Sequence, residues 1–187
     1  MTYKLIIFDF DGVIVESNSP LRKVIDKFDK GKVGEELFAS FISLIESPLP
    51  RTARNLKLRS LILRVAEELS DYRPNEGVVD FIRHINGYKM AIFSINRKDT
   101  IKEHLEGLGI LGKFDDLIVS GEDVEKLKPS PAGLIWILAD AKVWPHEAVY
   151  YGSGSADSDA ARDARVKFVE SLDELKRALD LRTSAPH

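Results

Sequence analysis

The sequence predicts an α/β fold: a mostly parallel sheet of about five strands with helices on both faces, plus an inserted small helical cap. Short apolar runs alternate with helical patterns, which is typical of strand–helix–strand units joined by right-handed crossovers. The first run, Leu5–Phe8, has no polar interruption, as expected of a strand covered on both faces. Residues 17–72 show helical patterns only, so they are predicted to be an insertion. Together these observations indicate a Rossmann-like core.

Composition sets the broad class of protein. The 187 residues suffice for one core of ordinary size plus a small insertion. With 27 basic and 30 acidic residues the formal net charge is -3, so neither nucleic acid nor a membrane is expected as a partner. The absence of cysteine excludes disulfides, thiol catalysis and thiolate zinc sites. No apolar run has the length of a membrane span or a signal peptide, so a cytoplasmic protein is expected.

Taken in order, the first strand ends in an acidic turn, and the helical insertion follows. Ser19 and Pro20 have the types preferred at a helix cap and first helical position. The core domain is therefore predicted from residues 1–16 and 73–182, and the cap domain from residues 17–72. A short tail at residues 183–187 is expected to fray.

After the insertion, strands and helices alternate again. The strands expected here are residues 88–93, 116–119, 148–151 and 166–169. Helices are expected before, between and after them. Two of these helices have the spacing of a capping box, in which Thr100 pairs with Glu103 and Ser171 pairs with Glu174.

Polar residues follow several of the predicted strands. Asp9 and Asp11 come after the first strand, and Ser94 comes after the second. Lys128 follows the third, and a glycine-rich segment, 152–159, follows the fourth. Because ligands bind at the carboxyl ends of the strands in an open α/β sheet, these groups are expected to share one site. Two carboxylates at the end of an apolar strand are costly to bury without a cation or a reaction that uses them.

These residue types suit phosphoryl chemistry. A carboxylate pair can hold Mg²⁺ through oxygen ligands, and a further free carboxylate can attack phosphorus to form an aspartyl phosphate. A hydroxyl, a lysine and backbone N–H groups can hold a phosphoryl group. Gly12 permits a tight turn that brings the main chain close to such a ligand. The alternatives are an acidic capping turn at Asp9, a helix cap at Ser94 and a solvated cation at Lys128.

The four motifs together resemble those of the haloacid dehalogenase-like hydrolases. In family order they are Asp9–Val13, Phe93–Ser94, Lys128–Pro129 and Gly152–Asp157. The resemblance covers nearly the whole chain. Further segments are similar to the phosphoglycolate phosphatase and β-phosphoglucomutase branch, and they are residues 73–78, 114–115 and 120–124. That branch carries a helical cap between its first two motifs, in agreement with the predicted insertion.

The resemblance implies a role for each motif residue. Asp9 is expected to be the nucleophile and a magnesium ligand. Asp11 is expected to protonate the leaving oxygen and then activate water, with its main-chain carbonyl on the metal. Ser94 and the N–H group of Ile95 are expected to bind phosphoryl oxygens, as is the turn at Gly12. Lys128 is expected to neutralise the charge that the phosphate shares with Asp9.

The fourth motif departs from the family pattern. The family usually has an aspartate that binds the metal directly where this chain has Ser153. A serine hydroxyl is neutral and a weak ligand for Mg²⁺, so weaker metal binding and lower activity are expected. Asp157 is expected to bind the metal directly or through water. Asp159 is a further candidate, but it fits the following helix better.

The substrate pocket is predicted from residues near the motifs in the sequence: Glu16, Asn18, Asn96 and Arg97. The third helix of the cap is basic, with Arg51, Arg54, Lys57, Arg59 and Arg64. Such a helix could capture an anionic substrate, but a solvated helix face is the favoured interpretation.

The leading hypothesis is a Mg²⁺-dependent phosphatase that acts on a small phosphorylated metabolite through an aspartyl phosphate, as a monomer or a homodimer. One alternative is a catalytically impaired relative that binds a phosphorylated ligand or a protein partner, for which Ser153 is the sequence support. Another is a phosphomutase, which would share the same core. A dehalogenase is disfavoured, because Asp11 and the metal-type acids suit phosphorus chemistry.

Overall fold

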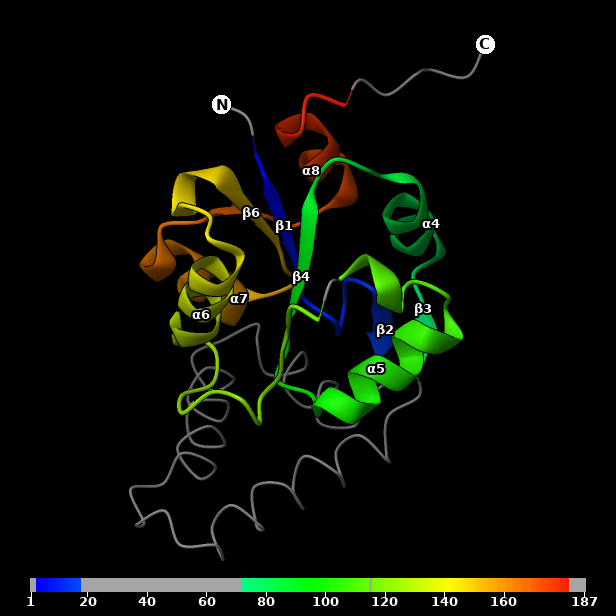
Figure 1. Ribbon diagram of the computed structural model, residues 1–187, viewed down its shortest axis with the longest axis horizontal. Coiled ribbons are helices and arrows are strands. Elements are labelled where there is room, and N and C mark those ends of the chain that lie inside the picture. Colours follow the sequence, from blue (N-terminus) through cyan, green and yellow to red (C-terminus); the bar gives the residue numbers. More distant parts are fainter. Residues whose placement is uncertain (1–2, 18–71, 115, 182–187) are drawn as a thin grey trace, which may run out of the picture.

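The computed structural model describes residues 3–17, 72–114 and 116–181 (Figure 1). The predicted cap, apart from its end residues Ser17 and Tyr72, lies outside the described residues, and so does the predicted tail. Within the described part, no helix is long and apolar enough to cross a membrane.

The core is a five-stranded sheet with strand order β5-β4-β1-β6-β7. The strands are β1 (Leu5–Phe8), β4 (Lys89–Phe93), β5 (Ile118–Val119), β6 (Ala148–Tyr151) and β7 (Lys167–Val169). All four neighbouring pairs are parallel. The predicted α/β sheet is therefore confirmed, with β1 at its centre. Strand β5 is shorter than expected because Asp116 has a φ of 60°, a left-handed conformation that cannot continue a strand.

Helices cover both faces of the sheet (Figure 1). On one face lie α4 (Glu76–His84), α5 (Lys98–Gly107) and α8 (Leu172–Ala178), and on the other α6 (Ala132–Ala141) and α7 (Ser155–Ala164). Two short 3₁₀ helices span Leu111–Lys113 and Pro145–Glu147.

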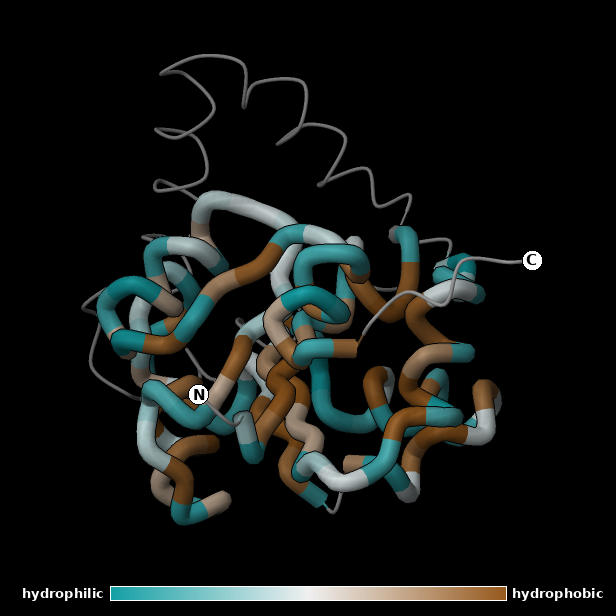
Figure 2. Tube along the Cα trace, turned by 90° about the horizontal axis from the view of Figure 1, so that it is seen from above, coloured by the Kyte–Doolittle hydropathy of each residue, from teal (hydrophilic) through white to brown (hydrophobic). Residues whose placement is uncertain are grey.

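Strand β1 supplies both hydrophobic cores. Ile6 and Phe8 pack with the side chains of α4, α5 and α8, whereas Leu5 and Ile7 pack with those of α6 and α7. This division follows from the alternation of side chains along a strand. Figure 2 shows the central strands mainly in brown, the hydrophobic end of the scale. The uninterrupted apolar run in the sequence therefore reflects a strand buried on both sides.

A short antiparallel ribbon lies at the boundary of the insertion. It pairs β2 (Val15–Ser17) with β3 (Tyr72–Pro74), and Ser17 is the partner of Tyr72. The prediction of helical structure over residues 17–72 was wrong at Ser17 and at Tyr72, because backbone pairing between β2 and β3 extends both segments. Glu16 pairs with Arg73 in the same ribbon.

The two predicted capping boxes have different outcomes. Helix α5 begins at Lys98, ahead of Thr100, and its N-cap residue makes no side-chain capping bond, so that prediction was wrong. The chain turns directly after Ser94, whose hydroxyl accepts a hydrogen bond from the Asn96 amide at 3.1 Å, and the helix starts early. At the second box the Ser171 cap is confirmed, since its hydroxyl accepts from the Glu174 amide at 3.2 Å, whereas the Glu174 side chain accepts from the Glu170 amide at 3.0 Å.

Candidate active site

The carboxyl ends of β1, β5 and β6 lead to a buried charge cluster. The Nζ atom of Lys128 lies 2.8 Å from Oδ1 of Asp9 and 2.7 Å from Oδ1 of Asp157. The relative exposures of Asp9, Lys128 and Asp157 are 6%, 4% and 5%. Charges that are buried to this extent require partners, and here one ammonium group serves two carboxylates.

Aromatic rings surround the ammonium group of Lys128. Its Nζ atom lies 4.7 Å from the centre of the Phe93 ring and 5.5 Å from that of Tyr150. Such contacts stabilise a cation that is shielded from water. Burial tends to lower the pKa of Lys128, but the charges of Asp157 and Asp9 outweigh burial and raise it. The lysine is therefore held in its charged form.

Asp157 receives hydrogen bonds on both carboxylate oxygens. Tyr150 donates its hydroxyl to Oδ1 at 2.6 Å, and the Ser153 amide donates to Oδ2 at 3.0 Å. Burial tends to raise the pKa of Asp157, but Lys128, Tyr150 and Ser153 outweigh burial and hold it below the usual value. Asp157 thus anchors Lys128 as an ionised carboxylate. Its role as a metal ligand stays a prediction.

Asp9 stands in a different environment. Its Oδ1 atom accepts from the Phe10 amide at 2.8 Å as well as from Lys128. Burial raises the pKa of Asp9 to about 7, the charge of Asp157 adds to this effect, and Lys128 opposes it. A carboxyl group of this kind gains most from a further cation nearby, because its ionised form is the one that burial disfavours.

Asp11 meets Ser153 across the site. The Ser153 hydroxyl donates to the main-chain oxygen of Asp11 at 3.0 Å. Asp11 itself is half-buried. Gly12 has a φ of 77°, which favours glycine, and its amide donates to the Val15 oxygen at 2.6 Å. Gly12 therefore shapes the turn after β1, and its predicted phosphate contact stays a prediction.

The loop after β4 carries the predicted phosphate-binding groups. Ser94 is 1% exposed, and Ile95 is half-buried. The side-chain amide of Asn96 donates to the Tyr72 hydroxyl at 3.3 Å, which ties this loop to the ribbon. The Tyr72 ring packs against His104, with 4.7 Å between the ring centroids.

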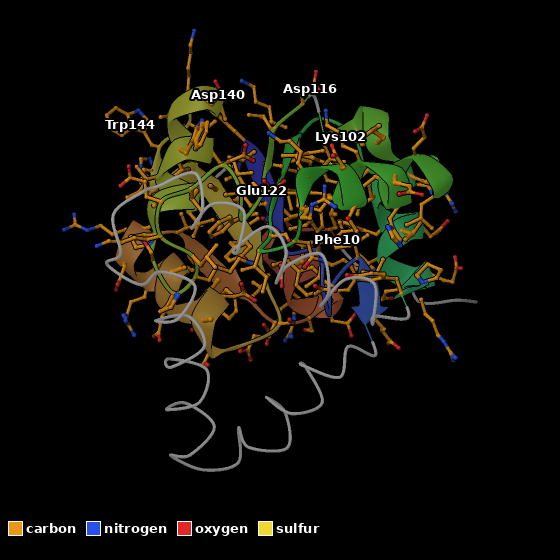
Figure 3. All side chains as sticks on the ribbon, turned by 90° about the horizontal axis from the view of Figure 1, so that it is seen from below. Phe10, Lys102, Asp116, Glu122, Asp140 and Trp144 are labelled. Carbon is orange, nitrogen blue, oxygen red and sulfur yellow. The ribbon has the colours of Figure 1, made fainter. Side chains whose placement is uncertain are left out.

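The predicted pocket residues are placed as follows. Asn96 is buried, Glu16 is exposed on β2, and Asn18 lies outside the described residues. The guanidinium group of Arg97 lies 3.6 Å from a carboxylate oxygen of Asp99 and 3.6 Å from one of Glu122 (Glu122 is labelled in Figure 3). Arg97 is thus engaged by acids of its own core.

Two tyrosines were missed by the sequence analysis. Tyr150 lies in an apolar strand and was treated as core, although a buried tyrosine hydroxyl usually needs a partner. Tyr72 stands at the boundary of the insertion. In both cases the sequence shows only that a tyrosine carries a hydroxyl group on an otherwise apolar side chain. It does not show which residue this hydroxyl binds.

The oxygen atoms at this site are of the type that binds a magnesium ion, but they are few. Among the described residues, no group of three or more His, Cys, Asp or Glu side chains is arranged to hold a metal ion. The Asp9 carboxylate and the Asp11 main-chain oxygen are ligands of the type that Mg²⁺ accepts. Ser153 adds a neutral oxygen. A hard cation that keeps several waters is compatible with this set.

Comparisons with known proteins identify the family of this chain. A family model described as haloacid dehalogenase-like hydrolase matches residues 6–170. Pyrophosphatase PpaX of Halalkalibacterium halodurans is 28% identical over 89% of this chain and 82% of its own length. Phosphoglycolate phosphatase 1 of Pseudomonas aeruginosa is 25% identical over 88% of this chain and 67% of its own length.

A solved structure shares the fold. It is that of YfnB from Bacillus subtilis, a provisionally assigned hydrolase of the same superfamily, bound to magnesium. The TM-score is 0.63 and the sequence identity is 16%, and the match covers 96% of this chain and 100% of the other.

Proposed function

The chain belongs to the haloacid dehalogenase-like hydrolase family, and we propose that it is a magnesium-dependent phosphatase acting on a small phosphorylated metabolite. The observation that carries this proposal is the buried contact of 2.8 Å between Lys128 and Asp9. A carboxylate beside a fixed ammonium group suits attack on phosphorus, because the cation offsets the charge that the phosphate brings. The two enzyme relatives are both named as phosphatases, which supports the same class of reaction.

The reaction proposed for these residues has two steps. A carboxylate oxygen of Asp9 forms a bond to phosphorus while the bond to the leaving oxygen breaks, and Asp11 gives that oxygen a proton. Asp11, now ionised, then takes a proton from water. The water oxygen bonds to phosphorus, the bond to Asp9 breaks, and inorganic phosphate leaves.

Other residues hold the phosphoryl group during both steps. The Ser94 hydroxyl and the Ile95 N–H group are proposed to donate to its oxygens, and Lys128 to offset its charge. Asp157 keeps Lys128 in place, as the 2.7 Å contact indicates. Mg²⁺, when bound by the Asp9 carboxylate and the Asp11 main-chain oxygen, with Ser153 as a weak third ligand, would supply further positive charge beside the phosphate.

The division into a core and a cap is also a proposal. The core would comprise residues 1–16 and 73–182, and residues 17–72 would contribute to the choice of substrate. The ribbon supports this division, because Ser17 and Tyr72 are paired where the insertion begins and ends.

A second candidate is a catalytically impaired protein that binds a phosphorylated ligand or a protein partner. It is favoured by the hydrogen bond from Ser153 to the Asp11 oxygen, which uses one of the two lone pairs of an oxygen that the magnesium ion would need.

Phosphate release from an aryl phosphate, with Mg²⁺ titrated upward from zero, tests the leading proposal. We expect release that appears only at high Mg²⁺ and is absent in Asp9→Asn. Turnover retained by Asp9→Asn would refute the aspartyl-phosphate mechanism. If the natural chain releases no phosphate at any Mg²⁺ concentration but Ser153→Asp does, the natural chain is catalytically impaired, as the second candidate requires, and thermal stabilisation by a phosphorylated ligand without turnover then tests its binding function.

A further inference from the structure

The loop after β4 lies in backbone contact with the turn after β5. The Gly121 amide donates to the main-chain oxygen of Asn96 at 3.2 Å. A Cβ atom at Gly121 would lie 2.2 Å from the main-chain oxygen of Ile95 and 3.0 Å from its carbonyl carbon. Because backbone atoms cannot move aside as a flexible side chain can, any side chain at Gly121 would displace the segment around Ile95.

The turn after β5 is in turn held by Asp123. Its Oδ2 atom accepts from the Ser120 amide at 2.8 Å and from the Ser120 hydroxyl at 2.7 Å. Ser120 is fully buried, and the side chain of Asp123 is 21% exposed. A carboxylate that accepts two such hydrogen bonds closes the turn tightly.

Asp123 also reaches the far end of the loop. The Nζ atom of Lys98 lies 3.1 Å from Oδ2 of Asp123 and 3.2 Å from Oδ1. Lys98 is the first residue of α5, directly after the loop. The loop from Ser94 to Arg97 is therefore held at its middle by Gly121 and at its end by Asp123.

We propose that Gly121 and Asp123 are positioning residues that set the geometry of the phosphate-binding loop, and through it the placement of the Ser94 hydroxyl and the Ile95 N–H group. This inference rests on the proposed function for the identity of the ligand. It assigns a part in phosphate affinity to the turn at residues 120–123, without contact between the turn and phosphate; Glu122 of this turn is labelled in Figure 3.

The test compares Gly121→Ala with Gly112→Ala in the full chain. A Cβ atom at Gly112 meets nothing within 4 Å, so this variant is a matched control for the same chemical change. The readouts are the amide NMR resonances of Ile95 and Asn96, the Kd of inorganic phosphate in the presence of Mg²⁺, and KM and kcat for an aryl phosphate.

We expect Gly121→Ala to shift both resonances and to raise the Kd and KM about tenfold or more, since a misplacement of about 1 Å can cost up to about a hundredfold. Gly112→Ala should match the natural chain in every readout. Unchanged resonances with unchanged Kd in Gly121→Ala, or an equal change in Gly112→Ala, would overturn the inference.

Variants of Asp123 provide a second test, which does not depend on whether Gly121→Ala folds. Asp123→Asn keeps an oxygen for the Ser120 amide, so it should weaken phosphate binding less than Asp123→Ala does. Equal phosphate affinity in both variants and in the natural chain would refute the role of Asp123. If the natural chain neither binds phosphate nor turns over, the proposed function fails, while the Ile95 resonance still decides whether the turn sets the loop.

Discussion

The hydroxyl of Ser153 donates a hydrogen bond to the main-chain oxygen of Asp11 over 3.0 Å. This contact joins the segment after β6 to the turn after β1. A cation bound to the same oxygen would repel the hydroxyl proton, so Ser153 would have to rotate before it could act as a ligand. In the conformation described here the Ser153 hydroxyl would therefore oppose a metal ion at this oxygen, whereas an aspartate at this position would attract one.

Ser153→Asp should raise the affinity for Mg²⁺ about tenfold or more, because one added charge close to a cation contributes on the order of 1–4 kcal/mol. Isothermal titration calorimetry with MgCl₂ measures this directly, without turnover. Ser153→Ala is the control, since it removes the hydroxyl and adds no charge. Equal Mg²⁺ affinity in the aspartate variant and the natural chain would contradict a metal site at this position.

Lys128→Met should lower the free energy of unfolding by about 3–5 kcal/mol, because it leaves Asp9 and Asp157 buried without their common partner. Urea denaturation in the presence of a chelator measures the loss. Lys126→Met, at an exposed lysine, should change stability by less than about 0.5 kcal/mol. Similar midpoints for the two variants would mean that the buried charges are stabilised by other groups.

Tyr150→Phe should lower the free energy of unfolding by about 1.5–3 kcal/mol, because it removes the hydroxyl that donates to the ionised Asp157 at 2.6 Å. Tyr88→Phe removes a hydroxyl from a half-buried tyrosine and serves as the control. Thermal and urea unfolding of both variants provide the comparison. No difference between them would show that the Tyr150 hydroxyl contributes little to the site.

The environment of Asp123 predicts how the stability of the fold depends on acid pH. Burial tends to raise its pKa, but the hydrogen bonds from Ser120 and the charge of Lys98 outweigh burial and hold the pKa below the ordinary value of 3.8. The ionised carboxylate therefore stabilises the fold above the unfolded-state pKa, and this stabilisation is lost as the pH falls through the lower folded-state pKa.

Asp123→Asn should accordingly be less stable than the natural chain at neutral pH, and the difference should narrow at about pH 3. Urea denaturation midpoints measured at several pH values give the stability of the natural chain and of Asp123→Asn as functions of pH. Two curves that stay parallel down to acid pH would exclude this carboxylate as a source of the pH dependence.

Much of this arrangement could be predicted from the sequence. The apolar run before Asp9 indicated a central strand, and the rule that ligands meet at the carboxyl ends of parallel strands brought Lys128 to Asp9 across 119 positions of sequence. That rule needs only the end of each strand and the parallel direction of the strands, which the alternation of apolar runs with helical patterns predicts. The family resemblance inferred from the four motifs is confirmed by the family model.

Other features had no readable pattern. The strands of the ribbon are three residues each and include Glu16 and Arg73, so they show no alternation of apolar side chains. The bond from Tyr150 to Asp157 depends on where a single hydroxyl points, which periodicity cannot specify. The same holds for Gly121. Its close contact with the backbone of Ile95 is reflected in the sequence only by the presence of a glycine.

The pairing of Ser17 with Tyr72 has a consequence for how this core can be redesigned. Two residues that face each other across an antiparallel pair can be joined by a hairpin turn of two residues. For a flexible chain that joins two such positions, the entropic cost of closure grows only with the logarithm of its length. We therefore expect that a segment of another length or origin, grafted between these two positions, would leave the order and register of the five parallel strands unchanged.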